Sequence, residues 1–212
     1  MCSSDLTRIG LIRLVGQRDW EGGLAALEVV EADRPDVLDA LLEARAALGA
    51  PPTREDLAPF LASKDPAVQA AAVRALARLD EPGALQEVGR WATATDHGPA
   101  VQEAAIEALG ATKRPQAAPF LRQTFGSTNP TLQQASARAL LELDEATGSA
   151  TLSDLALRGD SAETRRYAAL TLVLTRGRDS PAVQQLLARN PDADVRHVLE
   201  HGFEMRDAHH HD

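Results

Sequence analysis

The chain has 212 residues, 44% of them apolar and 25% charged, which is long enough and apolar enough to bury a core and excludes a disordered chain. The formal net charge of −9 argues against a nucleic acid or an anionic membrane as partner, and the single cysteine excludes both a disulfide framework and a cysteine-ligated zinc site. Alanine and leucine dominate while aromatics reach only 3%, so closely packed helices are favoured over a sheet sandwich, and no apolar run approaches the roughly 20 residues that span a bilayer.

The first five residues read differently from the rest. The string from Met1 to Asp5 matches one translation frame of a sequencing-library adapter and lacks the basic start and apolar centre of a signal peptide. We therefore expect residues 1–5 to be a non-native leader on a truncated reading frame, so that a targeting signal or an upstream domain would be missing. The alternative is a natural but unusual N-terminus.

A repeat of 31 to 33 residues runs through residues 6–205. Each unit begins a helix at an anchor residue, and apolar or small residues recur three, five and eight positions after it, which predicts the buried stripe of an amphipathic helix. Arg45 and Glu200 interrupt this stripe. The anchors are Leu6, Val37, Val68, Val101, Leu132, Thr164 and Val195.

The starts of these anchor helices agree as well. Three positions before the anchor stand residues that favour the N-cap, with Arg34 as the exception, and prolines in four units occupy the first helical position, where no hydrogen bond is lost. The expected caps are Asp65, Gly98, Asn129, Ser161 and Asp192, and the prolines are Pro35, Pro66, Pro99 and Pro130.

A second helix is predicted between successive anchor helices. We place these helices at about 20–31, 53–62, 81–93, 114–125, 150–158 and 180–189, with Trp20 and Trp91 packed in them. Turns are expected at Gly49, Gly110, Gly126, Gly148 and Gly177. No segment has the period of a strand. One helix pair is too small to close a core, so neighbouring pairs must stack.

The segments Asp65–Leu76 and Gly98–Gly110 resemble HEAT repeats, most closely the short bilin-lyase-like variety. The resemblance covers about six repeats plus a leading half, and it implies an all-α, right-handed α-solenoid of stacked antiparallel helix pairs, similar to HEAT and armadillo proteins. One departure is the residue after the anchor, where the family favours arginine and Gln69, Gln102 and Gln133 stand here. The polar tail at 206–212 follows a degraded last repeat.

The resemblance also implies that the anchor helices line a concave face. Positions two and six after each anchor then form one exposed face, called the ridge below, whose mixed charge suits a protein partner better than a polyanion. Asp39, Gln134 and Leu170 belong to it, as do Arg8, Ile12 and Ala70. The predicted contact residues are Glu43, Arg74, Glu103, Glu107, Arg138, Arg166, His197 and His201.

Catalytic chemistry finds little support in the sequence. His197 and His201 have helical metal-binding spacing, with Glu200, Glu204 and the histidines of the tail nearby, but no third ligand is specified and no metal or other cofactor is predicted. His97 is expected in a turn. No His-Glu dipeptide occurs, which excludes a deoxyhypusine hydroxylase, and the acidic charge disfavours a HEAT-like DNA glycosylase.

The sequence therefore predicts a non-catalytic scaffold that binds a protein partner, or a missing upstream domain, on its concave face. We expect it to be the C-terminal part of a longer bacterial-type protein, without membrane insertion or nucleic-acid binding. The alternative is a bilin-lyase-like enzyme or a chromophore-handling subunit.

Overall fold

The computed structural model describes residues 3–17, 22–32, 34–81, 83–177, 179–189 and 191–199. These residues form helices, turns and bends but no strand, which confirms the all-α prediction. None of the helices in these ranges combines the length and the apolar character that a bilayer crossing requires. The chain divides into two compact units, Met1–Ala108 and Leu109–Asp212, whose boundary falls inside one helix.

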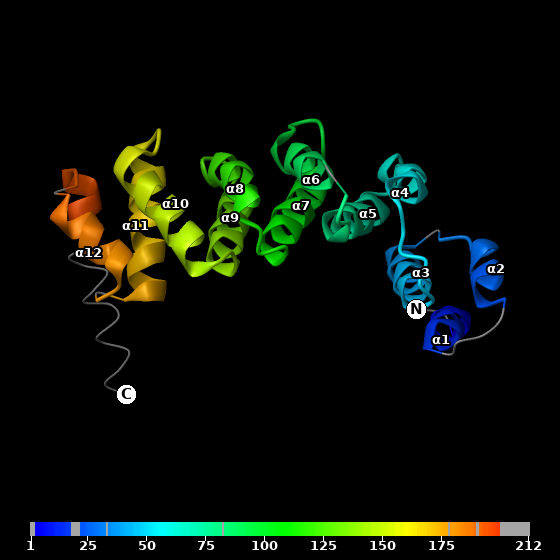
Figure 1. The fold of residues 1–212 in the computed structure, drawn as a ribbon. Coiled ribbons are helices and arrows are strands. Elements are labelled where there is room, and N and C mark those ends of the chain that lie inside the picture. The colour runs from blue at the N-terminus through cyan, green and yellow to red at the C-terminus, as the bar shows by residue number, and fades with distance from the viewer. Residues whose placement is uncertain are drawn as a thin grey trace. The chain divides into compact units, whose positions relative to one another are not determined.

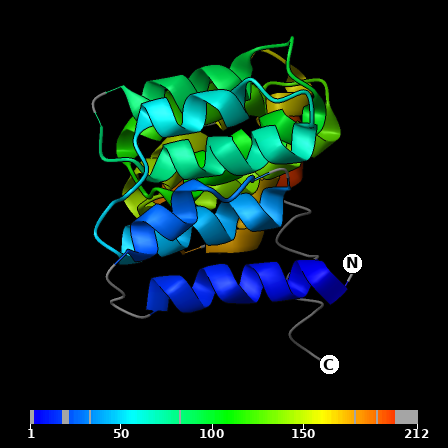
Figure 2. The ribbon, with the colours of Figure 1, turned by 90° about the vertical axis from the view of Figure 1, so that its right-hand side faces the viewer.

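Unit 1 is a stack of helices in which α1 packs on α3, α3 on α5, and α5 on both α4 and α6 (Figures 1 and 2). The anchor helices α1, α3 and α5 lie side by side, as the repeat predicts. The bounds are α1 Ser3–Gln17, α2 Gly23–Glu28, α3 Pro35–Ala47, α4 Arg54–Leu61, α5 Pro66–Arg78, α6 Ala84–Thr93 and α7 Pro99–Ala111.

Unit 2 repeats this arrangement. The pairs α8 with α9 and α10 with α11 pack closely, and α10 also contacts α8, α9 and α12 (Figure 1). Residues 193–199 form the helical start of the last anchor helix. The bounds are η1 Pro115–Ala117, α8 Ala118–Phe125, α9 Pro130–Glu142, α10 Glu145–Arg158, α11 Ala162–Arg176 and α12 Pro181–Ala188.

The predicted helix starts are confirmed at the atomic level. The four prolines are the first residues of α3, α5, α7 and α9. The side chains of Asp65, Asn129 and Ser161 accept hydrogen bonds from backbone N–H groups of the first turn, and Asp192 accepts one from Val195 at 2.9 Å. Arg34, the expected exception, stands at the N-cap of α3 without a capping bond.

The predicted buried stripe is confirmed in the interior repeats. Leu76, Leu109, Leu140 and Leu172, each eight positions after its anchor, are 0% exposed. Arg45 occupies the same position in α3, where it is half-buried and donates to the Asp56 carboxylate at 3.3 Å. An ion pair thus replaces an apolar contact at this one place in the stripe.

Two predicted turns are wrong, because Gly110 lies inside α7 and Gly148 inside α10. Helix α10 begins five residues before the predicted start, at Glu145, with the Asp144 side chain as its N-cap. A Cβ on Gly148 would stand 2.0 Å from the carbonyl oxygen of Leu140. The glycine is there because two helix backbones meet closely, which a rule that treats glycine as a helix breaker does not anticipate.

Another correction concerns where the second helix of the third pair begins. The sequence predicts this helix at about 81–93, yet α6 begins at Ala84 with Gly83 as its N-cap. Gly83 has φ +91°, a left-handed conformation that favours glycine. The chain makes a left-handed turn before α6, so a side-chain cap is not used.

The predicted buried face of α1 is right at Ile9 and wrong at the two later positions. Ile9 is 9% exposed, but Leu11 and Leu14 are 58% and 48% exposed, and Ile12, predicted on the ridge, is only 3% exposed. A helix turns about 100° per residue, so a shift of one position is enough to turn Leu11 outward and Ile12 inward.

Glycine contacts identify the true alignment of α1. A Cβ on Gly16 would lie 2.6 Å from Cα of Ala44 in α3, and a Cβ on Gly110 would lie 2.7 Å from Cα of Ala139 in α9. Because Ala44 and Ala139 are equivalent positions, Gly16 and Gly110 are equivalent too. At this contact α1 is therefore displaced by one residue from the predicted alignment on Leu6.

The residue after the anchor ties each helix pair together. Its side chain donates to a backbone carbonyl at the C-terminal end of the preceding helix, where carbonyls lack a partner within the helix. The bonds of the three glutamines are Gln69 to Leu61 at 3.1 Å, Gln102 to Ala94 at 2.7 Å and Gln133 to Phe125 at 3.2 Å.

Arg165 makes the same kind of bond, to Gly159 at 2.9 Å, and its Nε also donates to the Asp192 carboxylate of the next repeat at 2.6 Å. The next cap after each of the three glutamines is uncharged (Gly98, Asn129 and Ser161). In those repeats glutamine is sufficient to make the single bond to the preceding helix. Arginine occurs where the next cap is acidic, and it can bond to that carboxylate as well.

Candidate functional site

In unit 1 the ridge presents charged side chains from α3, α5 and α7. Glu43 and Glu107 are exposed, and Arg74 and Glu103 are half-buried. Two other predicted ridge positions are wrong, because Ala70 is 7% and Ile12 only 3% exposed. Ala70 is small enough to be covered by its neighbours, and Ile12 is turned inward by the shifted alignment of α1.

Asp39 is the most strongly desolvated carboxylate of this part of the ridge. Burial raises its pKa, and Glu43 and Asp36 raise it further, while Arg74 and Arg78 on the next anchor helix lower it. The two arginines compensate only part of the cost of burial. Unit 1 thus keeps a half-buried carboxylate on its ridge at some expense of stability.

In unit 2 the ridge carries Arg138, Arg166 and His197, all exposed, together with the exposed Gln134. His201, Glu200, Glu204 and the polar tail lie outside the described residues, as do Trp20, Met1 and Cys2. Among the residues that the structure describes, no three His, Cys, Asp or Glu side chains come together in a way that could hold a metal ion.

A groove of about 330 Å³ opens between α9 and α11, on the ridge of unit 2. Its walls combine polar and apolar side chains, and Leu174 at its edge is 45% exposed. The lining residues are Gln134, Ala137, Arg138, Leu141, Tyr167, Leu170, Thr171, Leu174 and Thr175.

Tyr167 explains why a groove lies at this place. It stands three positions after its anchor, where α3, α5, α7 and α9 all carry a buried alanine (Ala40, Ala71, Ala104 and Ala135). The Tyr167 ring packs against that of the fully buried Phe125, with centroids 5.4 Å apart and planes inclined by 31°. A side chain of this size keeps α11 from approaching α9 as closely as an alanine allows.

The stripe position three after the anchor is predicted to be buried, and at Tyr167 this prediction is wrong. Tyr167 is half-buried rather than buried, and burial raises the pKa of its hydroxyl while the nearby Arg138 guanidinium lowers it. The sequence signal for the groove was therefore present, as a tyrosine among four alanines at one repeat position.

In the ranges that the structure describes, six charged residues predicted as partner contacts on the ridge form no ion pairs, as is also true of Arg90 and Glu142 elsewhere, while some other charges are paired. On the other helices, ion pairs join Arg54 to Glu87 and Arg122 to Asp154. Among the described residues, the ridge side chains of Glu43, Arg74, Glu103, Glu107, Arg138 and Arg166 form no ion pair or hydrogen bond with one another or with other side chains.

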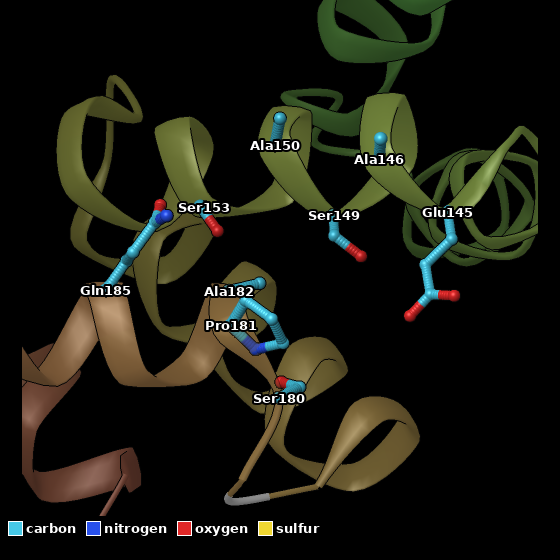
Figure 3. Close-up of a pocket in the computed structure, with 9 residues that line it drawn as sticks. All are labelled: Glu145, Ala146, Ser149, Ala150, Ser153, Ser180, Pro181, Ala182 and Gln185. Carbon is cyan, nitrogen blue, oxygen red and sulfur yellow. The ribbon is translucent and has the colours of Figure 1, made fainter.

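A second groove, of about 420 Å³, lies between α10 and α12 (Figure 3). The small residues Ala146, Ser149, Ala150 and Ser153 of α10 form one wall, facing Pro181 and Gln185 of α12. The Ser153 hydroxyl is buried and makes no hydrogen bond. The lining also includes Glu145, Ser180 and Ala182, and among these lining residues there is no histidine or lysine.

Sequence reasoning missed this second groove, although the alternation of alanine and serine along α10 was visible. His97 and Trp91 form a further small feature, with rings stacked at 3.9 Å and an interplanar angle of 19°. His97 lies in a turn and Trp91 in α6, as predicted for both.

The helix pairs, their caps and the solvent-facing ridge define a helical repeat protein. The family model of HEAT repeats matches residues 54–140 and 91–173, which is more than half of the chain, so this chain belongs to the HEAT-repeat family. A search of curated proteins found no match. HEAT repeats commonly form scaffolds that mediate protein interactions, and they define the chain as an α-solenoid protein.

Proposed function

We infer that this protein is a non-catalytic scaffold that binds a protein partner through its ridge. The absence of ion pairs at the ridge charges Glu43, Glu103, Glu107, Arg138 and Arg166, within the described part of the chain, carries this inference. A charge without an ion pair gains nothing for folding, whereas it can steer and orient a partner of complementary charge. The charge pattern changes along the chain, from mixed sign in unit 1, with Glu43, Arg74, Glu103 and Glu107, to Arg138 and Arg166 in unit 2.

The second supporting observation is the groove between α9 and α11. Partner binding concentrates in a few anchored side chains, which need a concave apolar surface surrounded by polar groups. The α9/α11 groove provides such a surface on the same side as the ridge arginines. The bilin-lyase-like alternative stays a hypothesis that none of these observations favours.

Site-specific photo-crosslinking in cells tests the proposal. A benzophenone amino acid is placed at Glu107 or Arg138 on the ridge and, as matched controls, at the exposed Gln86 of α6 or Arg158 of α10. We expect covalent adducts with a partner protein from the ridge positions and none from the controls. Adducts from the controls alone, or from no position, would contradict the proposal.

A further inference from the structure

The floor of the α9/α11 groove is apolar although threonines line it. Ala137 and Leu141 come from α9, and Leu170 and Leu174 from α11. The Thr171 hydroxyl donates to the carbonyl of Tyr167 at 2.8 Å, and Thr175 bonds the carbonyl of Thr171 in the same way. Because the helix backbone already takes the hydrogens of these hydroxyls, they offer a ligand no hydrogen-bond donor.

The rim of the groove offers hydrogen-bond donors without a partner. The Arg138 guanidinium and the Tyr167 hydroxyl form no hydrogen bond or ion pair within the part of the chain that the structure describes. Arg138 of α9 and Tyr167 of α11 both line this groove, from its two helices. No carboxylate lines the groove, and the nearest along the helices, Glu142 and Glu163, are exposed beside it.

We propose that the α9/α11 groove binds an acidic, apolar peptide segment of a protein partner. An aliphatic or aromatic side chain of the segment fills the floor between Leu141 and Leu174, and a neighbouring Asp or Glu carboxylate accepts from Arg138 and Tyr167. This assignment rests on the proposed function, because it specifies the chemistry of the partner that the ridge recognises.

Charge complementarity selects this occupant over the others. A carboxylate is the acceptor that an arginine and a hydroxyl can share, and a bond between charged partners is about twice as strong as a neutral one. A nucleic acid would need a row of cations, whereas the chain has a net charge of −9. A basic segment would place its charge against Arg138.

The anchor for the apolar side chain is rigid. Tyr167 is held by its ring contact with Phe125, which is 0% exposed, and the neighbouring Leu172 is equally buried. A pre-formed groove of this kind loses little conformational freedom when a segment binds.

Selection of random peptides displayed on phage tests the assignment, with the full chain as bait. We expect enriched peptides to carry Leu, Ile, Met or Phe beside Asp or Glu. A synthetic, fluorescein-labelled copy of the most enriched peptide should bind roughly tenfold or more weakly to Arg138→Glu and to Leu174→Asp. Tyr167→Phe, which keeps the ring and removes the donor, should weaken binding about fivefold.

A charge reversal at a residue that does not line the groove is the matched control. Arg90 is an exposed arginine of α6, and Arg90→Glu should change the affinity less than about twofold at physiological ionic strength. Far-ultraviolet circular dichroism of each variant checks that the fold is kept.

The outcomes separate this assignment from the proposed function. Enrichment of basic peptides, or of none, would overturn it, as would equal binding by wild type and Arg138→Glu. If photo-crosslinks still form at the ridge in that case, only the groove assignment fails. If ridge crosslinks are absent as well, both proposals fail.

Discussion

Replacing Gly148 by alanine tests how closely α10 approaches α9. The new Cβ would stand 2.0 Å from the carbonyl oxygen of Leu140 and 3.1 Å from the carbonyl carbon. Both are backbone atoms of α9, so no side-chain rotation relieves the overlap. Helix α10 must retreat by about 1 Å, which is an overpacking strain borne by the backbone.

Two opposing terms determine the free energy of unfolding of Gly148→Ala. Alanine is favoured over glycine in a helix interior by about 1 kcal/mol. Overpacking costs about 1–3 kcal/mol, and the upper end applies because a whole helix moves. We expect a net destabilisation of about 2 kcal/mol, which in a chain of this length lowers Tm by roughly 4–8 °C.

Gly10 is the matched control, because it lies inside α1 with no atom within 4 Å of a built Cβ. Gly10→Ala should stabilise its helix by about 0.5–1 kcal/mol through the same difference in propensity. Urea unfolding followed by circular dichroism measures both variants. If Gly148→Ala stabilised the protein as Gly10→Ala does, the close contact between α9 and α10 would be refuted.

Three further predictions concern the core, the ridge and acid stability. Leu109→Ala, at a position that is 0% exposed, should lower the free energy of unfolding in urea by about 2–5 kcal/mol. Gln134→Ala, at an exposed position, should change it by no more than about 0.5 kcal/mol. The reverse order would mean that the buried and exposed faces of the anchor helices are inverted. Because burial raises the pKa of Asp39, its charged form opposes folding, and Asp39→Asn should raise Tm at pH 7 but not at a pH below the carboxyl pKa in the unfolded state. The Val195 N–H, aided by Arg165, lowers the pKa of the Asp192 carboxyl, so the charged carboxylate stabilises the fold fully above about pH 4 and this stabilisation is lost as pH falls through the lowered pKa. In an acid titration Asp192→Asn should therefore lose less stability than wild type. An identical curve would contradict this role.

The rule that glycine marks a turn holds for some of the predicted glycines and fails for others. Gly49 and Gly177 adopt positive φ in turns, as glycine does when the backbone alone decides. Gly110 and Gly148 sit inside helices because a neighbouring helix leaves no room for a side chain. The sequence presents all four as the same residue, and only the packing distinguishes them.

The sequence was sufficient to predict an all-α repeat protein. It also predicted the repeat length, the capped helix starts and the buried leucines. Each of these depends on residues within one or two helical turns of each other, where hydrogen bonding and periodicity act. The candidate ridge charges follow from the same periodicity, and their exposure was predicted correctly at Glu43, Glu107, Arg138 and Arg166.

The alignment of α1, the start of α10 and the groove beside Tyr167 were decided by tertiary structure. Whether Ile12 or Leu11 is covered depends on the direction from which α3 approaches, and whether a tyrosine is buried depends on the spacing of two helices. These distances are set by contacts between side chains far apart in the sequence, whose volumes must fit together in three dimensions. The tyrosine among four alanines marks the repeat position of the groove, but the spacing of the two helices depends on this packing.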